Sequence, residues 1–323
     1  MSDTVLKLAD VEAARERIAG RVHRTPTFGS LTLGQRAGGA EVHLKAELFQ
    51  KTGSFKPRGA LNKLSQLSDE EKARGVISIS AGNHAQALAY ASAQEGIDAL
   101  VVMWQTASPL KIEAARGYGA TIDTEAPDIP EAFERLEQLI EETGRTLVHP
   151  YDDPLVMAGQ GTVGLELLED VPEPDVVLVP VGGGGLVSGI ATAVKGRSPD
   201  TRVVAVEPER SRALHESMKA GEPVTVEAAS LADGLNGPYA GANCVQQCLA
   251  LGVESVLVTE DELKDAFRFL YTRAKLAPEA AGAATTAALL ARKAAVEPGQ
   301  RVVAVVSGGN VATDTAVAIL GGR

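Results

Sequence analysis

Cysteine and aromatic residues are scarce in this chain. Among 323 residues only Cys244 and Cys248 carry thiols, and 4% of the residues are Phe, Trp or Tyr. The two cysteines stand four positions apart on an expected helix, without the further ligands that a zinc site needs. We therefore expect two buried free thiols and no zinc site.

Long apolar runs and clustered positive charge are also lacking. No run approaches the ~18 apolar residues of a membrane span, and the start Met1-Ser2-Asp3-Thr4 has no basic segment followed by an apolar core, as a secretory leader would. The net charge of -11 argues against nucleic acid and anionic membrane as partners, because both need a basic face. We expect a cytoplasmic protein with no nucleic-acid or membrane partner. The acid excess fits either ordinary solubility or a high-salt source.

Small and aliphatic residues are abundant instead. The hydrophobic fraction is 45%, and 33 residues are glycine. Aliphatic runs of this kind are typical of α/β proteins, whose parallel strands are buried on both faces. The length of 323 residues favours about two domains.

Two series of β-branched runs predict two sheets. The first series occupies residues 76–79, 99–103, 120–123 and 146–149, and the second occupies 176–181, 202–206, 255–258 and 301–306. We expect a small domain at 76–150 and a large domain made of 1–75 and 151–323, both with open, mainly parallel sheets. Open α/β sheets bind ligands beyond the carboxyl ends of their strands, so a ligand cleft is expected between the two domains.

A lysine stands between an aromatic residue and a proline in Ser54-Phe55-Lys56-Pro57, at an expected helix start. Ser54 is the expected N-cap, and Pro57 is tolerated only in a first helical turn. A lysine amine forms a Schiff base with an aldehyde cofactor, and the Phe55 ring can support a flat heteroaromatic one. The alternative is a solvated lysine at a helix entry, and three further segments count against it.

The first of these segments is the turn Ser80-Ala81-Gly82-Asn83-His84, which follows the strand at 76. Its backbone N–H groups at a helix N-terminus can bind a carboxylate, and Asn83 can hydrogen-bond a cofactor hydroxyl. Taken alone, a simple capped turn with His84 as a satisfied polar residue is the favoured interpretation.

The second and third segments also join a strand to a helix. Gly182-Gly183-Gly184-Gly185-Leu186 allows the backbone to wrap around a phosphate, and it matches neither nucleotide-binding glycine pattern. Ser307, in Ser-Gly-Gly-Asn at 307–310, offers one hydrogen bond to a ring nitrogen, although a plain N-cap is the alternative. Together with Lys56 these groups describe the binding of pyridoxal 5'-phosphate between two domains.

The same motifs carry a family resemblance. Ser-Phe-Lys-Pro-Arg-Gly-Ala, Ser-Ala-Gly-Asn-His, the tetraglycine loop and Ser-Gly-Gly-Asn, spread from Thr25 to Asn310, resemble the threonine dehydratase and serine racemase family. These are pyridoxal-phosphate enzymes of the tryptophan-synthase-like fold, fold type II. The resemblance implies that Lys56 binds the cofactor aldehyde, that Phe55 packs on the ring and that Asn83 contacts the 3'-hydroxyl. It implies that the phosphate is held by Gly182, Gly183, Gly184, Gly185 and Leu186, and that Ser307 faces the ring nitrogen. It also implies that the substrate carboxylate is bound by Ser80, Ala81, Gly82, Asn83 and His84. Glu279 matches a family acid near the cofactor whose role stays open, and the family also implies a homodimer or homotetramer.

Departures from the family pattern bear on metal and regulation. Some relatives bind a divalent cation through a Glu and an Asp six residues later, but here Glu207 is followed by Ala213, so we expect no metal. Met103-Trp104 replaces the usual Met-Pro, and we expect no counterpart of the C-terminal regulatory domain of biosynthetic threonine dehydratases.

The resemblance favours β-elimination from L-threonine or L-serine, which yields 2-oxobutanoate or pyruvate plus ammonia. Racemases of the family place a serine hydroxyl where this chain has Ala81, which favours a lyase. The alternatives are a serine racemase, a 3-hydroxyaspartate ammonia-lyase, and a non-catalytic protein that binds pyridoxal phosphate or an amino acid. The preference among threonine, serine and 3-hydroxyaspartate is not readable from the sequence.

Overall fold

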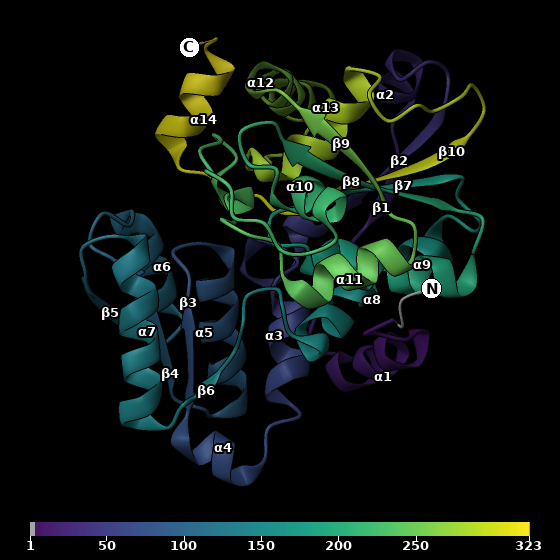
Figure 1. Cartoon of the computed structure of the whole chain (residues 1–323). Helices are drawn as coiled ribbons and strands as arrows, with labels where there is room; N and C mark the ends of the chain where they lie inside the picture. The colour runs from purple at the N-terminus through teal and green to yellow at the C-terminus, as the bar shows by residue number, and fades with distance from the viewer. Residues whose placement is uncertain (1–3, 323) are drawn as a thin grey trace.

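The computed structural model describes residues 4–322, which form two sheets with helices around each (Figure 1). Met1–Asp3 and Arg323 lie outside the described residues. Met1–Asp3 belong to the N-terminal stretch in which no leader was expected. The larger sheet has the order β1-β2-β10-β7-β8-β9. Its strands are β1 (Thr27–Gly29), β2 (Glu41–Ala46), β7 (Val176–Pro180), β8 (Arg202–Pro208), β9 (Glu254–Val258) and β10 (Arg301–Val306). Only the β1–β2 pair is antiparallel among these described strands.

The smaller sheet has the order β5-β4-β3-β6, and its strand pairs are all parallel. Its strands are β3 (Val76–Ile79), β4 (Ala99–Trp104), β5 (Thr121–Ala126) and β6 (Thr146–Leu147). The expected α/β fold with two mainly parallel sheets is therefore confirmed. The domain boundaries at 75/76 and 150/151 stay predictions.

Helices lie around both sheets. Those that precede, follow or connect strands of the larger sheet are α1 (Leu8–Ile18), α2 (Leu31–Arg36), α3 (Pro57–Leu64), α8 (Pro154–Asp170), α9 (Gly185–Arg197), α10 (Ala213–Ala220), α11 (Ala242–Ala250), α12 (Glu260–Phe269), α13 (Ala284–Leu290) and α14 (Thr313–Leu320). Those next to the smaller sheet are α4 (Asp69–Arg74), α5 (Asn83–Glu95), α6 (Pro109–Gly117) and α7 (Ile129–Thr143).

Strand β7 shows why the strands of the larger sheet are aliphatic throughout. Val176 and Leu178 belong to the core that contains residues of α12 and α13, whereas Val177 and Val179 belong to the core that contains residues of α8 and α9. Both faces of the strand are thus covered by helices, as expected for a central parallel strand.

Helix α3 links the two halves of the molecule. Ala60, Leu61 and Leu64 pack in the same core as Val76 and Leu88 of the smaller-sheet region. The helix also packs against α8 on the side of the larger sheet, and Figure 1 shows it between α5 and α8. The residue that precedes α3 is therefore placed at the junction of the two sheets.

The expected N-cap of α3 is wrong. Lys56 occupies the N-cap position with helical backbone angles, and no side chain caps the helix. Ser54 instead forms an isolated antiparallel bridge with Gly308, in an extended conformation. Pairing with a segment some 250 residues away sets the conformation of Ser54, and a local capping pattern carries no information about such pairing.

Two further features concern thiols and metals. Cys244 and Cys248 lie on α11 as buried free thiols, as expected. The Glu207 carboxylate accepts hydrogen bonds from the backbone N–H groups of Leu214 and His215, both at 2.8 Å. Across residues 4–322, no group of three or more His, Cys, Asp or Glu side chains is arranged to hold a metal ion. None of the helices in that range has the length and apolar character needed to cross a membrane.

Candidate active site

Lys56 lies at the junction of the two sheets with its amine enclosed. Its Nζ donates a hydrogen bond to the carbonyl oxygen of Pro150 at 2.8 Å and lies 5.3 Å from the centroid of the Phe55 ring. Burial lowers the pKa of Lys56 to about 8. Because the neutral amine is the form that attacks a carbonyl or accepts a proton, this lysine is suited to both tasks near neutral pH.

A chain of polar side chains joins the two halves next to Lys56. Asn83 Nδ2 donates to Glu279 Oε1 at 2.7 Å, and Asn310 Nδ2 donates to Asn83 Oδ1 at 2.8 Å and to the carbonyl oxygen of Thr52 at 2.7 Å. Burial, and then the charge of Asp233, raises the pKa of Glu279 to about 8. A protonated Glu279 is thus compatible with neutral pH.

The turn at 80–84 leads from β3 into α5. Gly82 is the N-cap residue, and its N–H donates to Ser80 Oγ at 3.2 Å. The next N–H groups at the start of α5 have no partner within the helix, which makes the turn suitable for a carboxylate. Ala81 contributes only a methyl group, which packs against the core of the smaller sheet.

His84 is buried in the same turn and is neutral. Its Nε2 donates to the carbonyl oxygen of Val148 at 3.1 Å, which assigns the proton to Nε2 because a carbonyl can only accept. Burial, assisted by the charge of Lys56, lowers the pKa of His84 to about 3. At neutral pH the side chain therefore adds no charge to the turn.

The tetraglycine loop leads from β7 into α9. Gly184 is the N-cap residue with φ of 102°, and the helix begins at Gly185. A Cβ on Gly183 would lie 2.3 Å from the Tyr151 ring, and one on Gly184 would lie 2.7 Å from Cys244 Cβ. Only glycine fits these positions, and the free N–H groups of the first helical turn can bind an anion.

The turn at Ser307 lies against the lysine segment. The Phe55 N–H donates to the carbonyl oxygen of Ser307 at 3.2 Å, and the Glu279 N–H donates to that of Gly308 at 3.0 Å. The structure therefore brings together Phe55, Lys56, Asn83, Glu279 and Ser307, which lie in distant parts of the sequence. Tyr151 and Pro150 connect this group to the glycine loop.

Sequence reasoning did not single out Pro150, Tyr151 or Asn310. Pro150 accepts the hydrogen bond of Lys56, and the Tyr151 ring packs on Gly183 with its hydroxyl donating to the carbonyl oxygen of Tyr239 at 3.2 Å. The first two lie a few residues after the end of β6, on the side of the sheet where ligands bind. Their position after a predicted strand was the feature of the sequence that could have identified Pro150 and Tyr151 as site residues.

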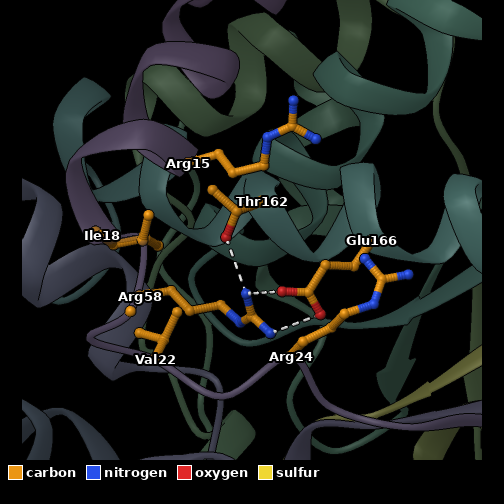
Figure 2. Close-up of a pocket in the computed structure, with 9 residues that line it drawn as sticks. Arg15, Ile18, Val22, Arg24, Arg58, Thr162 and Glu166 are labelled. Atoms are coloured by element: carbon orange, nitrogen blue, oxygen red, sulfur yellow. Dashed lines mark hydrogen bonds and ion pairs between the residues drawn. The ribbon is translucent and has the colours of Figure 1, made fainter.

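A separate cavity of about 150 Å³ lies beside α1 and α8, and none of its lining residues belongs to this group (Figure 2). Arg58 in its wall donates to Glu47, Glu166 and Thr162, so its guanidinium is fully used inside the protein. Arg24 on the same wall pairs with Glu169 and Asp170. The arginines are balanced by acids, and the cavity offers no free charge for a ligand.

Comparison with known proteins gives concordant matches. Residues 18–308 match the family described as pyridoxal-phosphate dependent enzyme. The chain is 44% identical over 310 residues to the catabolic L-threonine dehydratase TdcB of Staphylococcus aureus (strain N315), covering 95% of this chain and 90% of that protein. The structure of maize serine racemase matches with a TM-score of 0.91 and 36% identity, covering 96% of this chain and 95% of that one. The structure of a threonine deaminase from T.th. matches with a TM-score of 0.88 and 43% identity, covering 95% of this chain and 99% of that one.

The residues at the junction fit pyridoxal 5'-phosphate. Lys56 supplies an enclosed amine of lowered pKa for its aldehyde. The tetraglycine loop at the start of α9 supplies N–H groups for its phosphate. Next to Lys56, the hydroxyls of Thr52 and Ser54 are buried and have no hydrogen-bond partner within residues 4–322, which fits a place where a polar ligand binds.

Proposed function

Because this chain belongs to the pyridoxal-phosphate dependent enzyme family, we propose that it is an ammonia-lyase acting on L-threonine or L-serine. It would remove the β-hydroxyl and release 2-oxobutanoate or pyruvate together with ammonia. The observation that carries this proposal is the enclosed Lys56 amine, with a pKa of about 8, facing a site whose turn holds Ala81 in place of a hydroxyl residue. The similarity to a catabolic threonine dehydratase over 95% of the chain supports it.

When bound, pyridoxal phosphate withdraws electrons from the Cα of an attached amino acid, so that its Cα–H becomes acidic. The residues that would hold it are Lys56 at the aldehyde, Phe55 on the ring, Asn83 at the 3'-hydroxyl, Gly182, Gly183, Gly184, Gly185 and Leu186 at the phosphate, and Ser307 at the ring nitrogen. Glu279 would lie beside it through its bond to Asn83.

Three parts of the chain have separate roles in the proposed reaction. The backbone N–H groups at 80–84 bind the substrate carboxylate. Lys56 Nζ accepts the Cα proton, since a base of pKa about 8 is partly neutral at physiological pH. The Ser307 hydroxyl, unlike a carboxylate, cannot hold a ring nitrogen protonated, which favours rapid loss of the β-hydroxyl over other reactions at Cα.

Two alternatives use the same scaffold, and one belongs to a different class. A serine racemase would need a proton donor on the face of Cα opposite Lys56, where Ala81 offers only a methyl group. A 3-hydroxyaspartate ammonia-lyase would need a place for a second carboxylate. A non-catalytic binding protein would need no enclosed amine. The proposal also includes a cytoplasmic location and a homodimer or homotetramer.

The test combines colour and product formation. Purified protein incubated with pyridoxal phosphate should be yellow and should release keto acid from threonine or serine, whereas Lys56→Ala should lose both properties. Lys51→Ala, in the same segment, is the matched control and should retain them. A colourless wild-type protein would refute the cofactor assignment. Assays with threonine, serine and both 3-hydroxyaspartate diastereomers would rank the substrates.

A further inference from the structure

An ion pair spans the two halves of the molecule close to the candidate active site. Lys111 lies on α6, next to the smaller sheet, and its Nζ contacts Oδ2 of Asp233. Asp233 begins a short 3-10 turn at Asp233–Leu235, which belongs to the larger-sheet half. Both side chains remain partly exposed, at 32% for Lys111 and 56% for Asp233.

The turn that carries Asp233 lies against two parts of the site. A Cβ on Gly182, in the tetraglycine loop, would lie 3.2 Å from Leu235 Cα. A Cβ on Gly234 would lie 3.6 Å from Glu279 Oε1, the atom that accepts the hydrogen bond of Asn83. Asp233 therefore directly precedes Gly234, which lies next to the Glu279 carboxyl group in the site.

Three charged side chains act on the Glu279 carboxyl group in addition to its burial. Burial is the main cause that raises the pKa of Glu279, and Asp233 raises it further, whereas Lys111 and Lys56 lower it, so all three charges act at this place. Lys56 is needed at the cofactor aldehyde and the substrate Cα, and Lys111 is paired with Asp233. Neither lysine would then be available to pair with a second carboxylate on a substrate, and the negative charge of Asp233 would repel that carboxylate.

We propose that the Lys111–Asp233 pair is a specificity determinant that excludes substrates with a side-chain carboxylate. The enzyme then takes 3-hydroxy amino acids with neutral side chains and discriminates against 3-hydroxyaspartate. This inference rests on the proposed ammonia-lyase function and names its substrate class. Asp233 acts by withholding Lys111 and by repelling an anion, because like charges placed together in an interface are unfavourable.

The experiment measures binding as well as turnover. Dissociation constants of the holoenzyme are determined for L-2-aminobutyrate and L-aspartate, which lack a β-hydroxyl to eliminate. In parallel, kcat/KM is measured for L-threonine and L-threo-3-hydroxyaspartate. The wild-type protein should prefer the neutral compound of each pair by at least about tenfold. Asp233→Asn should reduce both preferences by about tenfold by releasing Lys111, and adding Lys111→Met should restore them.

The matched control is Asp261→Asn, an acid that is 94% exposed and lies 3.8 Å from Lys264 on the surface. It should leave both preferences at their wild-type values. If Asp233→Asn does not fold, Lys111→Met alone serves, and it should weaken aspartate binding further because Asp233 is left unpaired.

Two results would overturn the inference: a wild-type protein that binds aspartate as well as 2-aminobutyrate, or an Asp233→Asn protein with an unchanged preference. A failure of the proposed function looks different. In that case no keto acid forms from threonine or serine, while the binding preference and its response to Asp233→Asn still decide the role of the ion pair.

Discussion

Two lysines show how strongly the surroundings of one residue decide its chemistry. Lys45 is buried, and its Nζ donates to Glu166 Oε2 at 2.7 Å and to the carbonyl oxygen of Thr25 at 2.8 Å, so its charge is paired. The Lys56 amine donates to a neutral carbonyl, that of Pro150, and burial lowers its pKa to about 8. Lys56, half-buried and without a direct carboxylate partner, is the one suited to act as a base.

Ala81 leads to a prediction about stereochemistry. Without a proton donor opposite Lys56, reprotonation of Cα returns the original isomer, so Ala81→Ser should raise the ratio of D-serine to pyruvate formed from L-serine by at least about tenfold. Chiral analysis of residual serine after partial turnover measures this ratio. Ala93→Ser, on an exposed position of α5, is the control and should not change it. Comparable rates of D-serine and pyruvate formation by the wild-type protein would contradict the assignment.

His84 leads to a prediction about acid stability. Its pKa is lowered to about 3 in the folded protein, whereas an unfolded histidine titrates near ~6.5, so the unfolded chain binds the proton first as pH falls. The stability contributed by neutral His84 is complete above about pH 6.5 and is lost progressively down to about pH 3. This group alone should lower the free energy of unfolding by about 2 kcal/mol between pH 7 and pH 5.

Urea unfolding of the cofactor-free protein at several pH values checks this expectation. The loss of stability on acidification should be about 2 kcal/mol smaller in His84→Gln, whatever the stability of that variant at pH 7. His23→Gln, which changes an exposed histidine, should follow the wild-type curve. Parallel pH dependence of wild-type and His84→Gln proteins would show that His84 is not the group responsible.

At the scale of elements, the crossing of α3 and α8 decides where Lys56 lies. Glycines on both helices allow close approach: a Cβ on Gly59 would lie 2.4 Å from Gln160 Nε2, and one on Gly159 would lie 2.4 Å from the carbonyl oxygen of Arg58. Arg58 then reaches from α3 to Glu166 on α8 at 2.7 Å (Figure 2). Packing and a buried ion pair together hold the beginning of α3 in place.

Substitution at this crossing should therefore be costly. Gly159→Ala should lower the free energy of unfolding by about 1–3 kcal/mol, because backbone atoms that cannot move aside occupy the place of the new methyl group. Gly117→Ala is the matched control in helix α6, since a Cβ there meets nothing within 4 Å. It should be neutral or stabilising by up to about 1 kcal/mol. Chemical unfolding of both variants measures the difference, and equal effects would refute the close-approach argument.

At the scale of the whole molecule, side chains near both ends of α5 join the two halves. Asn83 bonds to Glu279 and Asn310 at the site, and Lys111 pairs with Asp233 nearby. Arg21, in the segment after α1, pairs with Glu95 at the end of α5. The site is therefore built from side chains of both halves. Its geometry depends on how the two sheets are held relative to each other.

The surface of the whole molecule supports a prediction about assembly. Leu31 is 80% exposed and Val317 is 60% exposed, and Phe49 and Tyr271 are each about half exposed. Where exposed apolar side chains form one contiguous patch, association with another chain buries them. We expect sedimentation at micromolar concentration to give the mass of a homodimer or homotetramer, and a monomer under these conditions would refute the oligomeric proposal.

The sequence alone determined the two sheets and the kind of cofactor. Strands buried on both faces must be aliphatic along their whole length, so runs such as 176–181 and 301–306 predicted the strands directly. Glycines at a strand end and a lysine at a helix start are local patterns, and the local backbone fixes their conformation. These features can therefore be predicted without knowing what packs against them.

The tertiary structure alone decided which distant groups meet. The bridge of Ser54 to Gly308, the bond of Lys56 to Pro150, and the pair of Lys111 with Asp233 each join segments that lie far apart in the chain. Such contacts depend on how helices and sheets pack together, and no local periodicity records that arrangement. Folding therefore decides the pKa of Lys56 and the charges that a substrate meets, because both depend on burial and on neighbours brought together from both halves of the molecule.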